Sequence, residues 1–563
     1  MNNDTVSGAE ALVEMLAANG VRHVFGLCGD TSLPFYDALH RLDHGMTHIL
    51  ARDERSAGYM AEAYAKVSGK VGVCEGPSGG GATYLLPAVV EANESSVPVL
   101  GITSDVPVTS RGRYPLTELD QQRLYGSLTK WNGTADLPSQ VPGLVRAAFR
   151  AMTTGRAGAT HICMPYDIQK QRLDASALWV QPGHDSYPAS RSVPARAEIV
   201  AAAQMLRKAD NPVLICGGGV MLSGGTAELA ALAELLDAPV CTTVTGKGTI
   251  AESHPLAGGV VGANGGTPES RAIVEAADLV MFVGCRAGST TTENWRVPSN
   301  NIPIIHLDID ASVIGANYKV ASILVGDAKA SLSELTNALT DHRKRHGNTA
   351  KERVAAAQAA KRNRLAALAA DETKPLVPER ILQALNRIAT PETIVVADPG
   401  TPCPYVSCYF EIQKAGRSFL TNRAHGALGY SLSAAIGAWY AKPDSKVVAI
   451  MGDGSFGFTV GELETVARLG IPLVIIVVSN ATFGWIKASQ KSGYDERYFS
   501  VDFTLTDHAR IAAGNGIESY TVADPLDLEP RLREAFASDR AVLIDILTQP
   551  LQDAAAPVSQ WMG

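Results

Sequence analysis

The sequence lacks the features that mark several classes of protein. Its eight cysteines are scattered and none stands in a CxxC pair, so neither a zinc site nor a disulfide framework is expected, and the thiols fit a reducing compartment. The formal net charge of −8 gives no basic excess that would bind nucleic acid or an anionic membrane surface.

Long apolar runs are also missing. No stretch of about 18 apolar residues occurs along the 563 residues, so no membrane span is expected. Residues 1–10 are polar and contain no basic region followed by an apolar run, so no secretory signal is expected. These absences favour a cytoplasmic protein with small-molecule partners.

What the chain does contain is typical of a large enzyme. Hydrophobic residues make up 46% of it, with 52 glycines, and the length suggests several domains. Short apolar strands alternate with helical patterns, which indicates parallel βα units. The predicted fold is therefore α/β, with doubly wound parallel sheets whose sites lie at the carboxyl ends of the strands.

The alternation divides into three domains of similar size, predicted at residues 1–180, 190–345 and 370–550, with a tail at 551–563. A polar connector with prolines, Gln171–Arg196, separates the first two. Asp341–Asp371 is rich in Ala, Lys and Arg and is predicted to be an exposed helical linker.

The most informative motif is a glycine turn, Gly452–Gly457, that directly follows the apolar strand Val447–Met451. Such a turn lets backbone N–H groups approach a diphosphate closely. Asp453 and the amide oxygen of Asn480, which ends the next strand, are hard ligands suited to Mg²⁺. A plain tight turn is the alternative for the glycines taken alone.

This pattern resembles the thiamine diphosphate (ThDP) enzymes of the acetolactate synthase and 2-oxo acid decarboxylase family, whose signature is GDG followed by Asn-Asn. Ser479 replaces the first of those asparagines, which puts one hydrogen bond in doubt and leaves Asn480 as ligand. The resemblance implies that the backbone carbonyl of Thr482 is a third Mg²⁺ ligand. It further implies cofactor contacts from Gly452, Gly454, Ser455, Phe483 and Gly484.

A second, distant segment supports the same resemblance. Arg52–Ala65 resembles the family's glutamate helix and precedes the glycine-rich Gly76–Thr83, which includes Ser78. The resemblance implies that Glu54 contacts the cofactor's aminopyrimidine ring and helps to activate it. The alternative is a helix-start glutamate stabilised by the helix dipole, and Glu62 on the same helix is expected to be an exposed residue of that kind.

A third element lies between these two. In the family, residues matching Gly400 and Thr401 contact the diphosphate. Gly426 belongs to the motif Asn422–Leu432, in which Leu428 occupies the position that supports the cofactor from below, although an ordinary core leucine is the alternative. His425 is a candidate proton shuttle because histidine titrates near neutral pH. The resemblance also implies the order of pyrimidine-binding, middle and diphosphate-binding domains.

The middle domain carries no dinucleotide fingerprint. Cys216–Gly219 follows a strand, but position 222 is Leu where the third glycine is required. The corresponding domain of the family holds FAD or an ADP group, or is empty. The resemblance therefore leaves FAD or ADP open here without favouring it.

The substrate pocket is predicted from loops near the cofactor. Cys28, Gly29 and Asp30 follow the first strand, and Asp30 either handles protons or caps the helix beginning near Leu33. Thr117 stands where acetolactate synthases have Gln, and Trp485 presents an aromatic surface after the Mg²⁺ site.

The predicted activity is 2-oxo acid decarboxylation with carboligation, in a homodimer or homotetramer. The alternatives are a 2-hydroxyacyl-CoA lyase or oxalyl-CoA decarboxylase type, which the lack of Lys and Arg in Gln552–Gly563 argues against, and a non-catalytic nucleotide-binding protein of the same fold.

Overall fold

A computed structural model of the chain describes residues 5–342 and 349–559. They form two compact units. The first contains the chain up to Ser190 together with Asn422–Asp444 and Thr459–Ile471. The second contains Arg191–Thr421, Ser445–Phe458 and the chain from Pro472 onward.

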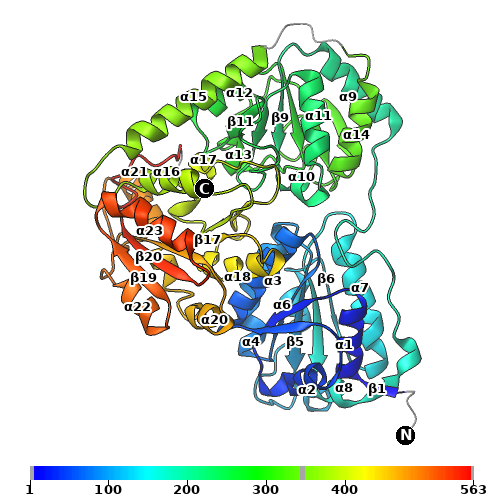
Figure 1. The fold of residues 1–563 in the computed structure, drawn as a ribbon. Coiled ribbons are helices and arrows are strands. Elements are labelled where there is room, and N and C mark those ends of the chain that lie inside the picture. The colour runs from blue at the N-terminus through cyan, green and yellow to red at the C-terminus, as the bar shows by residue number, and fades with distance from the viewer. Residues whose placement is uncertain (1–4, 343–348, 560–563) are drawn as a thin grey trace. The chain divides into compact units, whose positions relative to one another are not determined.

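The first unit is built on a six-stranded parallel sheet with the order β3-β2-β4-β5-β7-β6 (Figure 1). β4 and β5 are buried along their whole length, as expected for a sheet covered on both faces. Its strands are β2 (His23–Gly26), β3 (Thr47–Leu50), β4 (Gly72–Gly76), β5 (Val99–Asp105), β6 (Trp131–Thr134) and β7 (Thr160–Pro165). A short antiparallel pair, β1 (Thr5–Ser7) with β8 (Arg172–Asp174), stands beside it.

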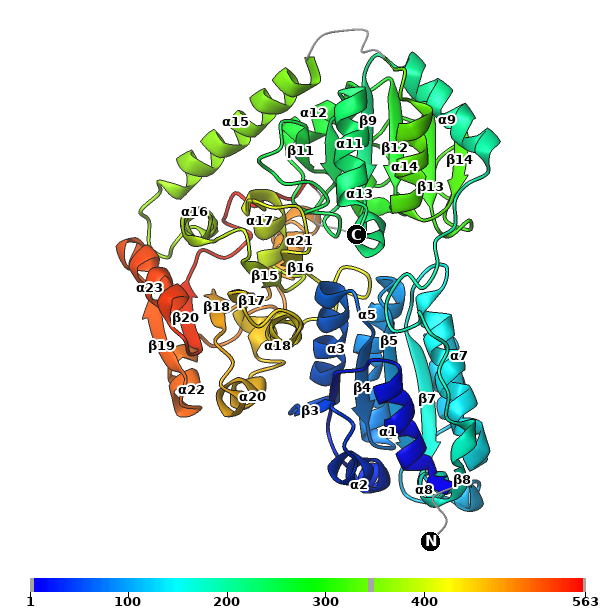
Figure 2. The same cartoon turned by 45° about the vertical axis from the view of Figure 1, so that its right-hand side comes forward.

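Helices cover both faces of this first sheet (Figure 2). One face packs against α3 and α5, and the other carries the apolar sides of α1, α2, α7 and α8. These helices are α1 (Gly8–Ala18), α2 (Leu33–Arg41), α3 (Glu54–Ser68), α4 (Gly80–Tyr84), α5 (Leu86–Glu94), α6 (Gln121–Gly126), α7 (Val141–Thr153) and α8 (Tyr166–Lys170).

Two helices from far along the chain also belong to the first unit. α18 (Ser431–Ala441) packs along α3, and a Cβ on Gly437 would lie 1.9 Å from the Met60 carbonyl oxygen, so only glycine allows this approach. Beside α20 (Glu462–Leu469), the backbone N–H of Arg52 donates to Glu462 (3.0 Å). Helix α3 is therefore enclosed within the unit.

The second unit contains two further parallel sheets of six strands, with the orders β11-β10-β9-β12-β13-β14 and β16-β15-β17-β18-β20-β19. Three parallel sheets with flanking helices confirm the predicted α/β fold. Their strands are β9 (Pro212–Cys216), β10 (Val240–Thr242), β11 (Ala257–Val260), β12 (Leu279–Val283), β13 (Ile304–Asp308), β14 (Ser322–Val325), β15 (Ile394–Ala397), β16 (Phe419–Leu420), β17 (Val447–Gly452), β18 (Val474–Ser479), β19 (Glu518–Val522) and β20 (Val542–Leu547).

Apolar layers attach the remaining helices to these sheets. The helices are α9 (Arg196–Lys208), α10 (Gly218–Ser223), α11 (Thr226–Leu236), α12 (Pro268–Glu275), α13 (Ser289–Thr292), α14 (Ala328–Ala338), α15 (Thr349–Ala369), α16 (Pro378–Ile388), α17 (Pro402–Tyr409), α19 (Asp453–Phe456), α21 (Gly484–Gly493), α22 (His508–Gly514) and α23 (Pro525–Ala537).

The linker prediction for Asp341–Asp371 is correct in its helix and wrong in its exposure. Residues 343–348 lie outside the described residues, and α15 follows them. Val354 and Leu365 of α15 are buried against the apolar layers of this unit. Their spacing of eleven residues keeps both on one helical face, so α15 is a packed element rather than a bare spacer.

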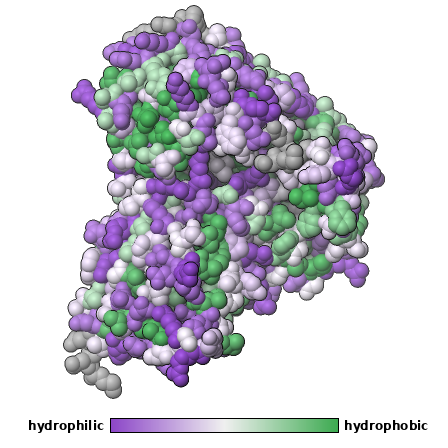
Figure 3. All heavy atoms as spheres, turned by 180° about the vertical axis from the view of Figure 1, so that it is seen from behind, coloured by the Kyte–Doolittle hydropathy of each residue, from purple (hydrophilic) through white to green (hydrophobic). Residues whose placement is uncertain are grey.

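The surface is mixed in polarity, as the composition suggests. Hydrophilic and hydrophobic side chains are interspersed over the face shown in Figure 3. Among the helices of the described residues, none combines the length and the apolar character needed to cross a membrane. Seven of the eight cysteines are buried, and Cys28 is exposed.

Candidate functional site

Asp453 connects two loops at the carboxyl ends of neighbouring strands, β17 and β18. Its Oδ2 accepts the backbone N–H groups of Asn480 (2.8 Å) and Ala481 (2.6 Å), and its Oδ1 accepts that of Gly454 (2.9 Å). The side chain is buried, and this burial raises the pKa of Asp453. The three N–H donors stabilise the charged carboxylate in place.

The neighbouring polar atoms suit a hard cation. Asn480 Oδ1 is buried and has no hydrogen-bond partner among the described residues, and a buried amide oxygen is costly to leave unpaired. The described residues hold no cluster of three or more His, Cys, Asp or Glu side chains placed for a metal. A site with one carboxylate, one amide and one backbone carbonyl needs no such cluster, because Mg²⁺ completes its shell with phosphate and water.

The glycines of this region leave the backbone accessible. No atom lies within 4 Å of the position that a Cβ on Gly452 would take. A Cβ on Gly454 would lie 2.8 Å from the Phe483 ring, and one on Gly484 would lie 3.0 Å from Thr401 Oγ1. Thr401 and Gly484, predicted from separate motifs, are therefore neighbours, which suits a loop set around a diphosphate.

Ser479, the departure from the family signature, has partners of its own. Its hydroxyl donates to Asp545 and lies 3.1 Å from His508 Nδ1. All three residues are buried. An asparagine is larger than serine at this fully packed position, so Asp545 and His508 account for the smaller residue.

Glu54 is the first residue of α3. Asp53 caps this helix by accepting the N–H groups of Arg55 (2.8 Å) and Ser56 (3.3 Å). The Glu54 side chain is 7% exposed, and burial raises its pKa. A Cβ on Gly81 would lie 2.9 Å from Glu54 Oε1, so the glycine-rich loop accommodates this carboxylate where a larger residue would displace it.

Three hydroxyl groups meet beside this glycine-rich loop. Ser78 Oγ lies 3.0 Å from the hydroxyl of Thr31 and 2.7 Å from that of Thr117. They come from the loops after β4, β2 and β5, and Thr117 adopts a left-handed φ of 73°. The structure therefore brings the predicted residues Ser78 and Thr117 together. It adds Thr31, which no sequence motif had marked as a site residue.

Asp30 does not cap the neighbouring helix. It lies in a single 3₁₀ turn, and Ser32 exchanges hydrogen bonds with the backbone of Gly29 instead. Asp30 and Cys28 are exposed, and the Asp30 carboxylate makes no hydrogen bond within the part of the chain that the structure describes. The capping alternative is therefore wrong, because a serine two residues later satisfies the turn.

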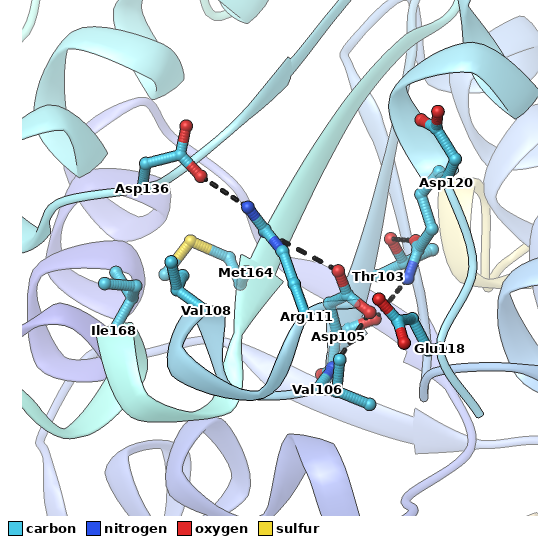
Figure 4. Close-up of polar contacts among 12 residues, drawn as sticks. Thr103, Asp105, Val106, Val108, Arg111, Glu118, Asp120, Asp136, Met164 and Ile168 are labelled. Carbon is cyan, nitrogen blue, oxygen red and sulfur yellow. Dashed lines mark hydrogen bonds and ion pairs between the residues drawn. The ribbon is translucent and has the colours of Figure 1, made fainter. Parts of the chain in front are cut away.

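An arginine holds the loop that carries Thr117. The Arg111 guanidinium lies between Asp136 (2.7 Å) and Asp105 (3.6 Å), the buried last residue of β5 (Figure 4). Burial raises the pKa of Asp105. The loop is also closed on itself, since the N–H of Gly112 donates to Glu118 (2.7 Å).

A buried glutamate that sequence analysis missed orders the loop of His425 and Leu428. Glu91 of α5 is 0% exposed, and its carboxylate accepts the N–H groups of Ala424 (3.3 Å), His425 (2.6 Å) and Gly426 (3.3 Å). Gly426 has a φ of 74° and open space around it, while Leu428 is half-buried and the His425 side chain is exposed. The signal in the sequence was an acidic residue directly after the apolar run Leu86–Val90.

The expectation for Glu62 is wrong. This residue is 0% exposed, pairs with Lys66 and accepts the hydroxyl of Tyr430 (2.7 Å). Tyr430 directly precedes α18. The packing of this segment on α3 is a contact between residues some 370 positions apart, which helix periodicity alone does not reveal.

Each compact unit thus gathers part of the predicted site. The second unit contains Gly400, Thr401, Gly452–Ser455 and Asn480–Trp485, and Trp485 is half-buried at the start of α21. The first unit contains Cys28–Asp30, Glu54, Ser78, Thr117 and His425–Leu428.

Comparison with known proteins identifies the class. Residues 6–124 match the N-terminal TPP binding domain of the thiamine pyrophosphate enzymes, 199–335 their central domain and 398–546 their C-terminal TPP binding domain. Thiamine pyrophosphate is another name for ThDP. The chain belongs to the thiamine pyrophosphate enzyme family and is a ThDP-dependent enzyme.

Three curated relatives are named acetolactate synthase large subunits. A probable acetolactate synthase large subunit of Methanococcus aeolicus is 35% identical over 97% of this chain and 92% of its own length. A second, from Methanocaldococcus jannaschii, is 35% identical over 97% and 93%. The acetolactate synthase large subunit of Corynebacterium glutamicum is 31% identical over 97% and 87%. This chain is therefore acetolactate synthase-like, as the sequence motifs predicted.

We expect the variant Glu91→Gln to disturb the loop of Gly426, because the new NH₂ group would face backbone N–H donors. The free energy of unfolding should fall by about 1–3 kcal/mol, and ThDP should bind more weakly. Chemical denaturation and calorimetric titration measure the two effects. The control is Glu94→Gln on the same helix, where the side chain is 46% exposed; equal behaviour of the two variants would contradict the role of Glu91.

Proposed function

We propose that the chain decarboxylates a 2-oxo acid and joins the remaining fragment to a carbonyl acceptor, in the manner of an acetolactate synthase, with ThDP and Mg²⁺. The observation that carries this proposal is similarity over nearly the whole chain to proteins named acetolactate synthase large subunits. ThDP, when bound, supplies a carbanionic carbon that adds to carbonyl groups.

The second unit supplies the residues that would hold the metal and the diphosphate. Asp453, Asn480 and the Thr482 carbonyl would bind Mg²⁺, and the orphaned Asn480 Oδ1 supports that assignment. The accessible backbone at Gly452 supports close approach of the diphosphate. The further contacts are assigned to Gly400, Thr401, Gly454, Ser455, Phe483 and Gly484.

The first unit supplies the residues for the organic part of the cofactor. Glu54 and Ser78 would contact the aminopyrimidine ring. Gly426 and Leu428 would contact the cofactor from below. The buried Glu54 carboxylate, whose pKa is raised by burial, is suited to exchange a proton with a ring nitrogen.

The residues assigned to the substrate come from loops of the first unit and from the start of α21 in the second unit. They are Cys28, Gly29, Asp30, Thr117 and Trp485. The hydroxyl group of Thr117, hydrogen-bonded to Ser78, supports a polar contact with a small substrate. Proton transfer is assigned to His425 and Asp30, which are both exposed.

The remaining assignments follow the same resemblance. The chain would act in the cytoplasm as a homodimer or homotetramer, with domains at residues 1–180, 190–345 and 370–550. FAD or ADP in the middle domain is not favoured, since Leu222 interrupts the glycine pattern. The relatives named above lend no support to an acyl-CoA substrate or to a non-catalytic role.

A substrate panel tests the proposed reaction. Several 2-oxo acids are supplied with and without a second 2-oxo acid or an aldehyde as acceptor, and CO₂ release and product mass are followed. We expect CO₂ together with a product that contains the donor fragment and the acceptor. Release of CO₂ with a free aldehyde as sole product, or cleavage of an acyl-CoA only, would contradict carboligation.

We expect Asp453→Ala and Asn480→Ala each to weaken ThDP binding, because water is a poorer replacement for a fixed oxygen ligand. The affinity should fall by at least about 10- to 100-fold, the range found for residues that merely support a metal ligand. Calorimetric titration of ThDP at several Mg²⁺ concentrations measures it, and raised Mg²⁺ should partly restore binding.

The matched control is Asp495→Ala, in the same unit, where the side chain is 90% exposed and pairs with Arg497 (2.9 Å). This control should bind ThDP like the wild type. ThDP affinity unchanged in both Asp453→Ala and Asn480→Ala would remove the metal assignment.

A further inference from the structure

The first unit contains a buried carboxyl group that the proposed function does not use. Glu75, near the carboxyl end of β4, is 1% exposed. Its Oε2 accepts the hydroxyl of Tyr36 at 2.7 Å, while its Oε1 is buried and has no hydrogen-bond partner within the described residues. An ionised carboxylate in such a place is costly unless a cation or several donors compensate it.

Among the described residues, no Lys or Arg compensates Glu75. The titratable groups that interact with it are Tyr36 from α2, Cys28 from the loop after β2, Glu54 from α3 and the neighbouring Cys74 of β4. None of its hydrogen bonds or ion pairs in the described parts of the chain involves Lys or Arg. Burial therefore raises the pKa of Glu75 to about 8, although Tyr36 and Ser32 act against this shift.

A hydrogen-bonded chain leads outward from this carboxyl group. The Tyr36 hydroxyl lies 2.9 Å from Nε2 of His48, a residue of β3, and the two rings are 4.8 Å apart. When Glu75 is ionised and accepts the Tyr36 hydroxyl proton, Nε2 of His48 carries the hydrogen that points to the Tyr36 oxygen. His48 is half-buried, and burial lowers its pKa to about 4, so the ring is neutral and forms no ion pair.

The inner end of this chain lies close to the predicted site. A Cβ on Gly26 would lie 2.8 Å from Glu75 Oε2, and one on Gly76 would lie 3.2 Å from Glu54 Cγ. Glu75 and Gly76 are consecutive residues of a strand, so their side-chain positions lie on opposite faces of it. The two carboxyl groups thus stand on either side of the end of β4, and each raises the other's cost of ionisation.

We propose that Glu75 holds a proton at neutral pH, exchanges it through Tyr36 and His48, and thereby keeps a second negative charge away from Glu54. Glu75 is then a positioning residue for Glu54, and this role rests on the proposed function of Glu54. Proton uptake takes three transfers: His48 Nδ1 gains a proton, Nε2 passes its proton to the Tyr36 oxygen, and the Tyr36 hydroxyl proton moves to Glu75 Oε2. His48 is left as the neutral Nδ1–H tautomer, and release reverses each transfer.

Ionisation of Glu75 should limit activity at alkaline pH. The added negative charge raises the pKa of Glu54, so this group releases a proton to a ring nitrogen less readily. Glutamine resembles the protonated form of glutamate. We therefore expect Glu75→Gln to keep the wild-type rate and the acid limb of the pH–rate profile, while the alkaline decline near pH 8 disappears.

The matched control is Glu379→Gln. Glu379 of α16 is also 1% exposed and has an unpartnered buried Oε1 among the described residues, and burial raises its pKa to about 7. It belongs to the second unit, outside the residues assigned to the site. The control should leave both limbs of the pH–rate profile unchanged.

Two measurements without ThDP test the proton itself in the full chain. The infrared C=O band of a protonated carboxyl group should be present in the wild type at pH 7 and reduced in Glu75→Gln. A folded-state pKa above the unfolded value means that the folded state binds more protons between about pH 4.5 and about 8, so stability falls as pH rises through that window. The free energy of unfolding of Glu75→Gln should therefore increase relative to wild type across it.

A second variant, Tyr36→Phe, covers the case in which Glu75→Gln does not fold. It removes the hydrogen bond that lowers the pKa of Glu75, so the alkaline limb should move to higher pH. No loss of the protonated-carboxyl band in Glu75→Gln would overturn the proton-holding role, whatever reaction the enzyme catalyses. If the band is lost and the alkaline limb persists unchanged in both variants, the role toward Glu54 is overturned while the proposed function stands.

Discussion

The constraint on which the whole structure depends is that its sheets are parallel and buried on both faces. The side chains of such strands pack in the core, and ligand-binding polar groups are placed on the loops at the carboxyl ends of the strands. Asp453 follows β17, Asn480 follows β18, Ser78 follows β4 and Thr401 follows β15. Within each unit, the predicted site residues are therefore loop ends that strand order places at one edge of a sheet, and they are not neighbours in sequence.

Burial of carboxyl groups around α3 is the second physical problem of this fold, and each group is compensated differently. Glu62 is paired with Lys66 and bonded by Tyr430. Glu91 is surrounded by backbone N–H donors. Glu75 accepts one hydrogen bond, from Tyr36, and is compensated by a proton. Glu54 lies against Gly81 of the glycine-rich loop.

Sequence reasoning predicted the parts that depend on local pattern. The apolar strand before Gly452 and the helix that begins at Glu54 are each encoded within about fifteen residues, and glycine is required where the backbone or a carboxylate must come close. The parallel α/β fold followed from the alternation of such segments, and the comparisons confirm the family.

Contacts between distant segments were beyond that reasoning. The burial of Glu62 and the anchoring of the Gly426 loop by Glu91 depend on α18 and its preceding loop reaching a helix more than 330 residues earlier. The partners of Ser479, His508 and Asp545, are likewise 29 and 66 residues away. Periodicity identifies which face of a helix is buried, but not which carboxyl group will find a donor there.

The central claim is that Glu54 activates bound ThDP while Asp453 and Asn480 mainly hold it. Deuterium exchange of the ThDP C2 proton, followed by quenched flow and NMR, tests this claim most directly with the variant Glu54→Gln. General acid–base groups contribute roughly 10²- to 10⁴-fold, so the exchange rate should fall by about that factor while ThDP affinity weakens only modestly. Exchange as fast as in the wild type would contradict the activating role of Glu54. The chain would then share the fold of the family but not this step of its mechanism.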